Sequence, residues 1–169
     1  MDIDSEFTGQ SIQRIEENTR RIATCISLLT DQEVWHRPNE SSNSIGNLML
    51  HLCGNITQYI ISSLGETKDN RNRDLEFSQK GNITKTLLLE KLENTISKAI
   101  EVIKKTTREK LIKIHAVQGF QLSGIGIIIH VVEHYSYHTG QISFYTKLLK
   151  DQDLGYYANI DLNTKNALE

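Results

Sequence analysis

The sequence predicts an all-α protein folded as a four-helix bundle, and three observations support this. The chain has 169 residues, with 38% hydrophobic and 24% charged, which is typical of a globular protein with one core. It contains a single proline, Pro38, so long helices can run without interruption. Four segments repeat apolar residues every three or four positions, which places them on one face of a helix. We expect one domain over residues 1–169, with its core at about 5–150 and a C-terminal tail at 151–169.

The first helix is expected from about Ser5 to Leu29. The residues Thr30-Asp31-Gln32-Glu33 then form a capping-box pattern, which predicts a short helical turn that ends before Pro38. The stripe of the first helix steps by three and four along the chain, at Ile12, Ile15, Thr19, Ile22, Ile26 and Leu29.

The second helix is expected to begin after Ser44, whose side chain can cap it, and to end near Leu64. Gly65 suits a left-handed helix C-cap. From Glu66 to Asn82 the chain is polar and mixed in charge, with Arg71 and Arg73 among several acids. We interpret this segment as a solvated loop, with a mobile lid as the alternative.

The third helix is expected from about Thr84 to Lys105. Residues 111–122 alternate in polarity and contain Gly119, which predicts an extended or hairpin-like connection. Ser123 can cap a fourth helix that ends near Lys150. The long connections after the second and third helices allow a topology other than simple up-down-up-down.

Composition and charge exclude several classes of protein. No apolar stretch is long enough to span a bilayer, and the acidic N-terminus is unlike a signal peptide, so we expect a cytoplasmic protein and no membrane partner. The net charge of −2, with no basic block, gives no reason to expect nucleic acid as a partner. Two cysteines, Cys25 and Cys53, are too few for a disulfide framework, and we expect both to be small buried residues.

Histidines are the candidate functional residues. His130, His134 and His138 recur every four residues in the fourth helix, and adjacent members of such a series can bind one metal ion. His130 and His138 lie about 12 Å apart along a helix axis, so one adjacent pair would serve one ion, and spacing leaves open which pair. We expect His36 and His115, which lack ligand spacing, to be packing or surface residues.

A third ligand would have to come from another helix, as in metal sites at the core of helical bundles. His51 lies midway along the second helix among apolar residues. Three neutral imidazoles with an open position suit Zn²⁺, Ni²⁺, Fe²⁺ or a similar divalent transition metal. The zincin motif is absent, because Tyr135, Ser136 and Tyr137 separate His134 from His138 and provide no glutamate base.

Two segments resemble a known family. The residues His134-Tyr135-Ser136-Tyr137-His138-Thr139-Gly140-Gln141-Ile142 resemble the His-x-x-x-His-x-Gly-Gln-Ile signature of the DinB-like superfamily. The turn Trp35-His36-Arg37-Pro38, followed by the helix that carries His51, resembles the first half of the same family. Within the superfamily the chain most resembles the DUF1572 branch, and the likeness covers roughly residues 5 to 150.

The resemblance implies a four-helix bundle of the DinB/YfiT-like type that holds a divalent metal through three histidines, often as a homodimer. Carried over by position, the ligands are His51, His134 and His138. His130 becomes a neighbour or an outer partner of the site, and Gln141 becomes a hydrogen-bonding candidate. Relatives of this type are transferases or isomerases that use an external low-molecular-weight thiol, and others are metal-dependent hydrolases.

Three hypotheses follow. The first is a metal-dependent enzyme resembling thiol S-transferases, with a small-molecule substrate and an open coordination position; a hydrolase using metal-activated water is its catalytic alternative. The second is a non-catalytic, metal-binding homodimeric stress protein, with closed coordination completed by His130 or a carboxylate. The third is a bundle whose histidines are only packed, which predicts that His51 faces away from His134 and His138.

Overall fold

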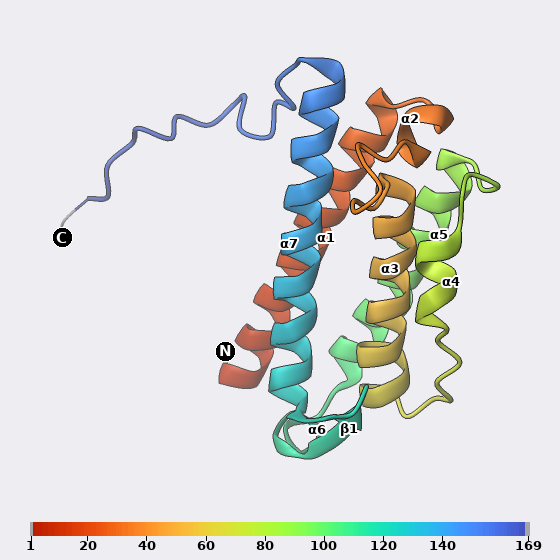
Figure 1. Cartoon of the computed structure of the whole chain (residues 1–169). Coiled ribbons are helices and arrows are strands. Elements are labelled where there is room, and N and C mark those ends of the chain that lie inside the picture. Colours follow the sequence, from red (N-terminus) through yellow and green to blue (C-terminus); the bar gives the residue numbers. More distant parts are fainter. Residues whose placement is uncertain (1, 168–169) are drawn as a thin grey trace.

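Four long helices form the bundle in the computed structural model, which describes residues 2–167 (Figure 1). They are α1 (Ile3–Leu28), α3 (Ile45–Ile56), α5 (Lys85–Lys105) and α7 (Gly124–Lys150). Helix α3 continues without a break into a π-helical segment, η1 (Thr57–Leu64). The predicted all-α class and the four helices are therefore confirmed, and none of the described helices has the length and hydropathy needed to cross a bilayer.

The order of the helices departs from up-down-up-down. α1 and α7 run in one direction and α3 and α5 in the other, because the connection from η1 to α5 returns along the whole bundle (Figure 1). α1 packs against α7 and α5, while α3 packs against α5 and α7. This arrangement makes α3 and α7 antiparallel neighbours, so residues at mid-height on both helices face each other.

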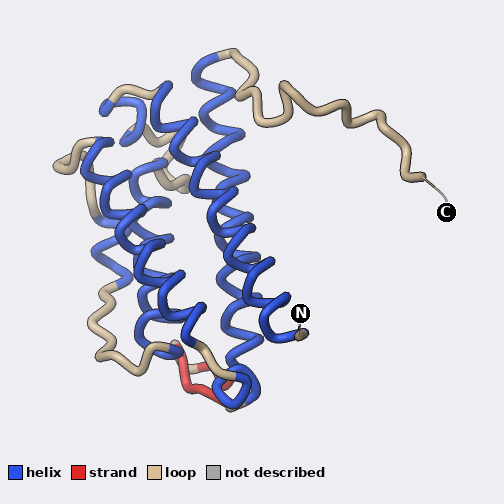
Figure 2. The backbone as a smooth tube through the Cα atoms, turned by 180° about the vertical axis from the view of Figure 1, so that it is seen from behind, coloured by secondary structure: helices blue, strands red, loops and turns tan. Residues whose placement is uncertain are grey.

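Short elements complete the ends of the bundle. α2 (Asp31–Trp35) has the predicted capping box between Thr30 and Glu33. At the other end, α6 (Arg108–Ile112) precedes an antiparallel hairpin of β1 (Ile114–Val117) and β2 (Phe120–Ser123), which is seen from behind in Figure 2. The hairpin agrees with the alternating pattern of residues 111–122, whereas α6 was not predicted.

The polar segment 66–82 is where the sequence-based interpretation is wrong. It contains a further helix, α4 (Arg73–Ser78), which packs against α3. Arg71 and Glu76 are buried rather than solvated, with side chains only 3% and 9% exposed. The two charges neutralise each other inside the protein. A segment with such a buried ion pair has the same balance of charges in its sequence as a loop whose charges lie in water, so the charge count does not tell them apart.

Gly65 is also not the left-handed residue that we expected, since its φ is −80° and the positive φ falls on Glu66. A glycine is still needed at position 65, because a Cβ there would lie 2.3 Å from the carbonyl oxygen of Ile61. The π-helical turn brings the carbonyl oxygen of Ile61 close to the backbone at position 65.

Candidate metal centre

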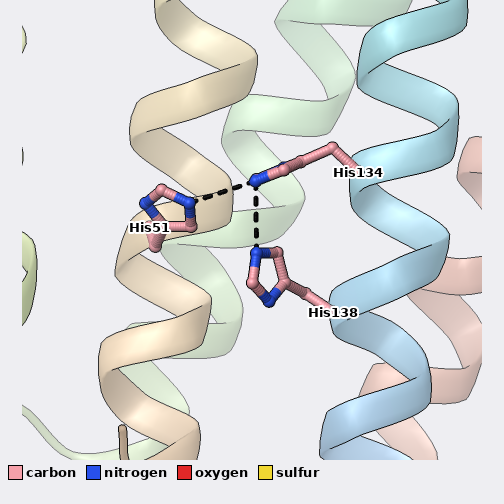
Figure 3. Close-up of side chains that lie close together, drawn as sticks. All are labelled: His51, His134 and His138. Carbon is pink, nitrogen blue, oxygen red and sulfur yellow. Dashed lines mark hydrogen bonds between the residues drawn. The ribbon is translucent and has the colours of Figure 1, made fainter.

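Three histidine side chains converge between α3 and α7. His51 projects from α3, while His134 and His138 project from successive turns of α7 (Figure 3). The Nε2 atom of His134 lies 3.1 Å from Nε2 of His51 and 3.1 Å from Nε2 of His138. One ligand atom from each residue lies within 4.8 Å of the others, so the three could hold one metal ion.

Local sequence places His51 at this point. Ser44 caps α3 by accepting from the backbone N–H of Asn47, which fixes where the helix begins. Asn47 also donates to the backbone carbonyls of Glu76 and Gln79, so the same residue ties α4 and the residue after it to α3. His51 follows one turn later, 7% exposed, on the face of α3 that meets α7.

The hydrogen bonds of the other ring nitrogens define the protonation of two of these histidines. Nδ1 of His51 lies 2.9 Å from Oε2 of Glu76, and Nδ1 of His138 lies 2.7 Å from Oε1 of Gln141. A carboxylate and an amide oxygen only accept, so each Nδ1 carries the hydrogen, and Nη2 of Arg71, 3.2 Å from Nδ1 of His51, is then a neighbour of that nitrogen and not a donor to it. In this tautomer of the neutral ring, each Nε2 presents a lone pair toward His134.

His134 cannot satisfy both lone pairs. A neutral imidazole has one N–H, so Nε2 of His134 donates to at most one neighbour. Its Nδ1 is buried and has no hydrogen-bond partner among the described residues. A cation held between the three Nε2 atoms would accept a lone pair from each of them, so this set of donors fits a metal ion.

The spacing of the nitrogens also suits a metal ion. For metal–nitrogen bonds of about 2.0–2.1 Å, two ligand nitrogens at right or tetrahedral angles lie about 2.9–3.4 Å apart. The separations of His134 from His51 and from His138, 3.1 Å each, fall in this range, and all three ligand atoms lie within 4.8 Å of one another. Imidazole donors suit Zn²⁺, Ni²⁺ and Fe²⁺ alike, so the residues do not select one of these metals.

Burial keeps two of the three histidines, His134 and His138, in the neutral form. Burial, with smaller contributions from His138 and His51, lowers the pKa of His134 from 6.5 to about 3. Burial also lowers the pKa of His138. A neutral imidazole is the form that binds a metal, so the surroundings of the cluster favour the binding form near neutral pH.

Glu76 and Arg71 support the site from α4 and the segment before it. The guanidinium of Arg71 donates to both carboxylate oxygens of Glu76, at 2.8 and 3.0 Å, and Oε2 also accepts from His51. Burial raises the pKa of Glu76, but the hydrogen bonds from His51 and Arg71 outweigh it and hold the pKa below its usual value. The resulting chain of contacts resembles the carboxylate–histidine–metal arrangement that orients ligands in metalloproteins.

Sequence analysis did not identify Glu76 as a functional residue. It lies 25 positions from His51 in a segment with several other acids. One signal was available: Gly54 leaves room for α4, because a Cβ at position 54 would lie 1.9 Å from Oε1 of Glu76. A glycine in the middle of a predicted helix indicates close packing, although it does not name the partner.

The other histidines lie outside the cluster of three. His130 is one turn from His134; its ring stacks on Tyr59 at 4.2 Å between centroids, and its Nε2 lies 3.3 Å from the amide nitrogen of Asn55. It is therefore a neighbour of the cluster, as expected. His115 is buried, with Nε2 3.0 Å from the carbonyl oxygen of Lys110, and His36 is exposed and bonded to Tyr145.

A family model described as "Protein of unknown function (DUF1572)" matches residues 2–159. No curated protein sequence matches the chain. The bundle is similar to several solved structures, all at low sequence identity, so this similarity shows the fold alone.

Three of these structures illustrate the likeness. A conserved protein from Enterococcus faecalis has a TM-score of 0.74 at 15% identity, covering 90% of this chain and 99% of that one. A DinB-like protein from Bacillus subtilis has a TM-score of 0.66 at 17% identity, covering 85% and 94%. A mycothiol-dependent maleylpyruvate isomerase has a TM-score of 0.65 at 12% identity, covering 84% of this chain and 63% of that one.

Proposed function

Because the chain belongs to the DUF1572 family, within the DinB-like superfamily, we propose that it is a metal-dependent enzyme acting with an external low-molecular-weight thiol. His51, His134 and His138 would hold one divalent transition-metal ion. The observation that carries the proposal is the convergence of three Nε2 atoms, two of which present lone pairs that His134 cannot satisfy together. A bound divalent cation would favour the thiolate form of a thiol, which is the nucleophilic form.

An open coordination position is supported by the residues around the cluster. Among the described residues, only the three histidines bring ligand atoms together at this point. His130 is engaged with Asn55 and Tyr59, and Glu76 with Arg71 and His51. Three protein ligands, with the fourth position left to water or substrate, are typical of catalytic metal centres, whereas structural centres have four. This favours an enzyme over the non-catalytic alternative.

The charges at the site favour an anionic ligand. Histidine binds a metal as a neutral donor, and the charges of Glu76 and Arg71 cancel. A divalent ion held by neutral donors keeps its full charge, so a thiolate or another anion is attracted to it. The carboxylate of Glu76 is fully occupied by hydrogen bonds, which argues against its use as the general base of a hydrolase.

Neither cysteine of the chain is placed to be the nucleophile. Cys53 follows His51 by two residues, and its thiol lies toward Thr95 on α5, where burial raises its pKa to about 11. Cys25 is buried against Tyr156 and Ser143, near the C-terminal half of α7. A thiol that reacts at the three histidines would therefore come from outside the chain. The mycothiol-dependent isomerase of similar fold supports this proposal by analogy only.

Metal analysis of the purified, untagged protein tests the proposal. We expect about one transition-metal ion per chain by mass spectrometry, and none in a His51→Ala, His134→Ala double variant. A His36→Ala variant is the control, because His36 lies outside the cluster. The metal-loaded protein is then assayed for transfer of a thiol to small electrophiles. Failure to take up added Zn²⁺, Ni²⁺ or Fe²⁺ would contradict the site, and a loaded protein without thiol-dependent activity would contradict the enzyme assignment.

A further inference from the structure

A pocket of about 450 Å³ lies between α3 and α7, one helical turn from His51 and His138, toward the end of the bundle where α7 ends. Its walls come from the segment 38–43, the first turn of α3 and the second half of α7. This volume is within the range of sites that hold small molecules. The pocket is separate from the cavity behind α3 that contains Cys53.

The pocket begins one helical turn from the candidate metal ligands on both helices. Leu48 precedes His51 by three residues, Gln141 follows His138 by three, and both line the pocket. Residues three apart lie on the same helix face, about 4.5 Å apart along the axis. Gln141 also contacts His138 directly through the hydrogen bond to its Nδ1.

In the opposite direction along α3 and α7 the space is filled. Asn55 lies one turn beyond His51 and contacts His130, which lies one turn before His134 and stacks on Tyr59. A molecule held at the three histidines would therefore extend past Leu48 and Gln141 into the 450 Å³ pocket rather than toward His130.

None of the side chains that line the pocket carries a charge. Ile45, Leu48, Phe144 and Leu148 provide apolar surface, and the polar groups are hydroxyls and amides. Phe144 is 71% exposed and Leu148 is 65% exposed, which is unusual for large apolar side chains beside a buried polar cluster. An uncharged apolar group seated between these residues and Leu48 would cover part of that surface.

We propose that this pocket holds the uncharged, apolar body of the molecule whose reacting atom lies at His51, His134 and His138. The inference rests on the proposed function, because the three histidines must bind a metal for a reacting atom to be held there. The ligand would have an apolar chain or ring next to the group that binds at the three histidines.

Thiol probes of different length test the pocket. The full-length protein is loaded with Co²⁺, and 2-mercaptoethanol, 1-butanethiol and 1-hexanethiol are titrated while the thiolate-to-cobalt absorption band is recorded. Each buried methylene strengthens binding about fourfold. We therefore expect hexanethiol to bind on the order of tenfold more tightly than butanethiol. A Phe144→Ser variant should reduce this gain, whereas Phe120→Ser, at another exposed phenylalanine on β2, should not.

The outcomes separate the two proposals. If all three thiols change the spectrum with equal affinity, the pocket proposal is overturned and the proposed function stands. If Co²⁺ binds but no thiol changes the spectrum, both the thiol function and the pocket assignment fail. Light scattering on the same samples tests whether the exposed residues of α7 form an interface with a second copy of the chain. If Phe144→Ser converts a dimer to a monomer, these residues belong to such an interface, and the pocket proposal is overturned.

Discussion

Replacing Glu76 by glutamine tests how the candidate metal centre is supported without changing any of the three candidate ligands. The side chain keeps its length and can still accept the hydrogen bond from Nδ1 of His51, but it loses its charge. The variant therefore weakens the electrostatic hold on the His51 ring and leaves the guanidinium of Arg71, only 3% exposed, without its counter-charge.

The contacts of Glu76 with His51 and Arg71 lead us to expect two effects of this change. Loss of an outer partner of a ligating histidine typically lowers metal affinity about 10- to 100-fold. Breaking a buried ion pair by removing one charge costs about 3 kcal/mol of folding free energy. For a chain of this size such a loss lowers Tm by roughly 6–12 °C. We expect Glu76→Gln to show both effects.

Affinity is measured by competition with a chromophoric chelator at pH 7, and stability by thermal unfolding of the metal-free protein. Glu33→Gln is the matched control, because Glu33 is bound by Lys150 at the end of the bundle and should leave metal affinity unchanged. The double variant Arg71→Met, Glu76→Gln removes the unpaired charge, so it should recover stability but not affinity. Wild-type affinity in either variant would refute the role of the Glu76 charge in holding His51.

Three further predictions concern pH, Gln141 and the glycines. Burial lowers the pKa of His134 to about 3 in the folded protein, against 6.5 in the unfolded chain. Between these two pH values the unfolded chain binds more protons, so the Tm of the metal-free protein should fall as the pH drops from 6.5 toward 3. The fall should be less steep in His134→Gln. A Tm that does not change over this range would contradict the neutral, buried state of His134. Gln141→Ala removes the acceptor of the Nδ1 hydrogen of His138, so it should weaken metal binding by about tenfold in the same chelator competition. An unchanged Kd would show that this hydrogen bond does not orient the His138 ring. Gly54→Ala places a Cβ 1.9 Å from Oε1 of Glu76, so it should lower the free energy of unfolding by about 1–3 kcal/mol in chemical denaturation. Gly140→Ala, whose Cβ would have no atom within 4 Å, should leave stability unchanged or raise it. Equal effects of the two variants would argue against tight packing of α4 on α3.

Much of the local structure could be predicted because it depends on neighbours in sequence. The capping residues Thr30, Ser44 and Ser123 all cap the helices that were expected to follow them, since a side chain two or three residues from a free N–H acts locally. The hairpin of residues 114–123 is also a local structure, with the turn at Gln118 and Gly119 between its strands. Helix periodicity placed His134 and His138 on one face before any fold was known.

The π-helical segment and α4 could not be predicted in the same way. Residues 57–64 have ordinary helical periodicity, and the sequence does not distinguish an i→i+4 from an i→i+5 hydrogen-bond pattern there. α4 has only six residues and is held by partners distant in the chain, including the hydrogen bonds from Asn47 and Arg37 to its backbone. Its stability comes from tertiary contacts, which short-range patterns do not record.

The sequence by itself determined the class of fold and the long helices, because apolar periodicity is a property of single helices. Histidine spacing left open which adjacent pair on the last helix binds, and the set His51, His134 and His138 came from the resemblance to the DinB-like family. Only the tertiary structure decided that His51 meets His134 and His138, since that contact depends on α3 and α7 being antiparallel neighbours. The tertiary structure also decided that Glu76 and Arg71 belong to the site. A charged residue in a polar segment can be solvated or buried with a partner, and the choice depends on which surface the segment packs against.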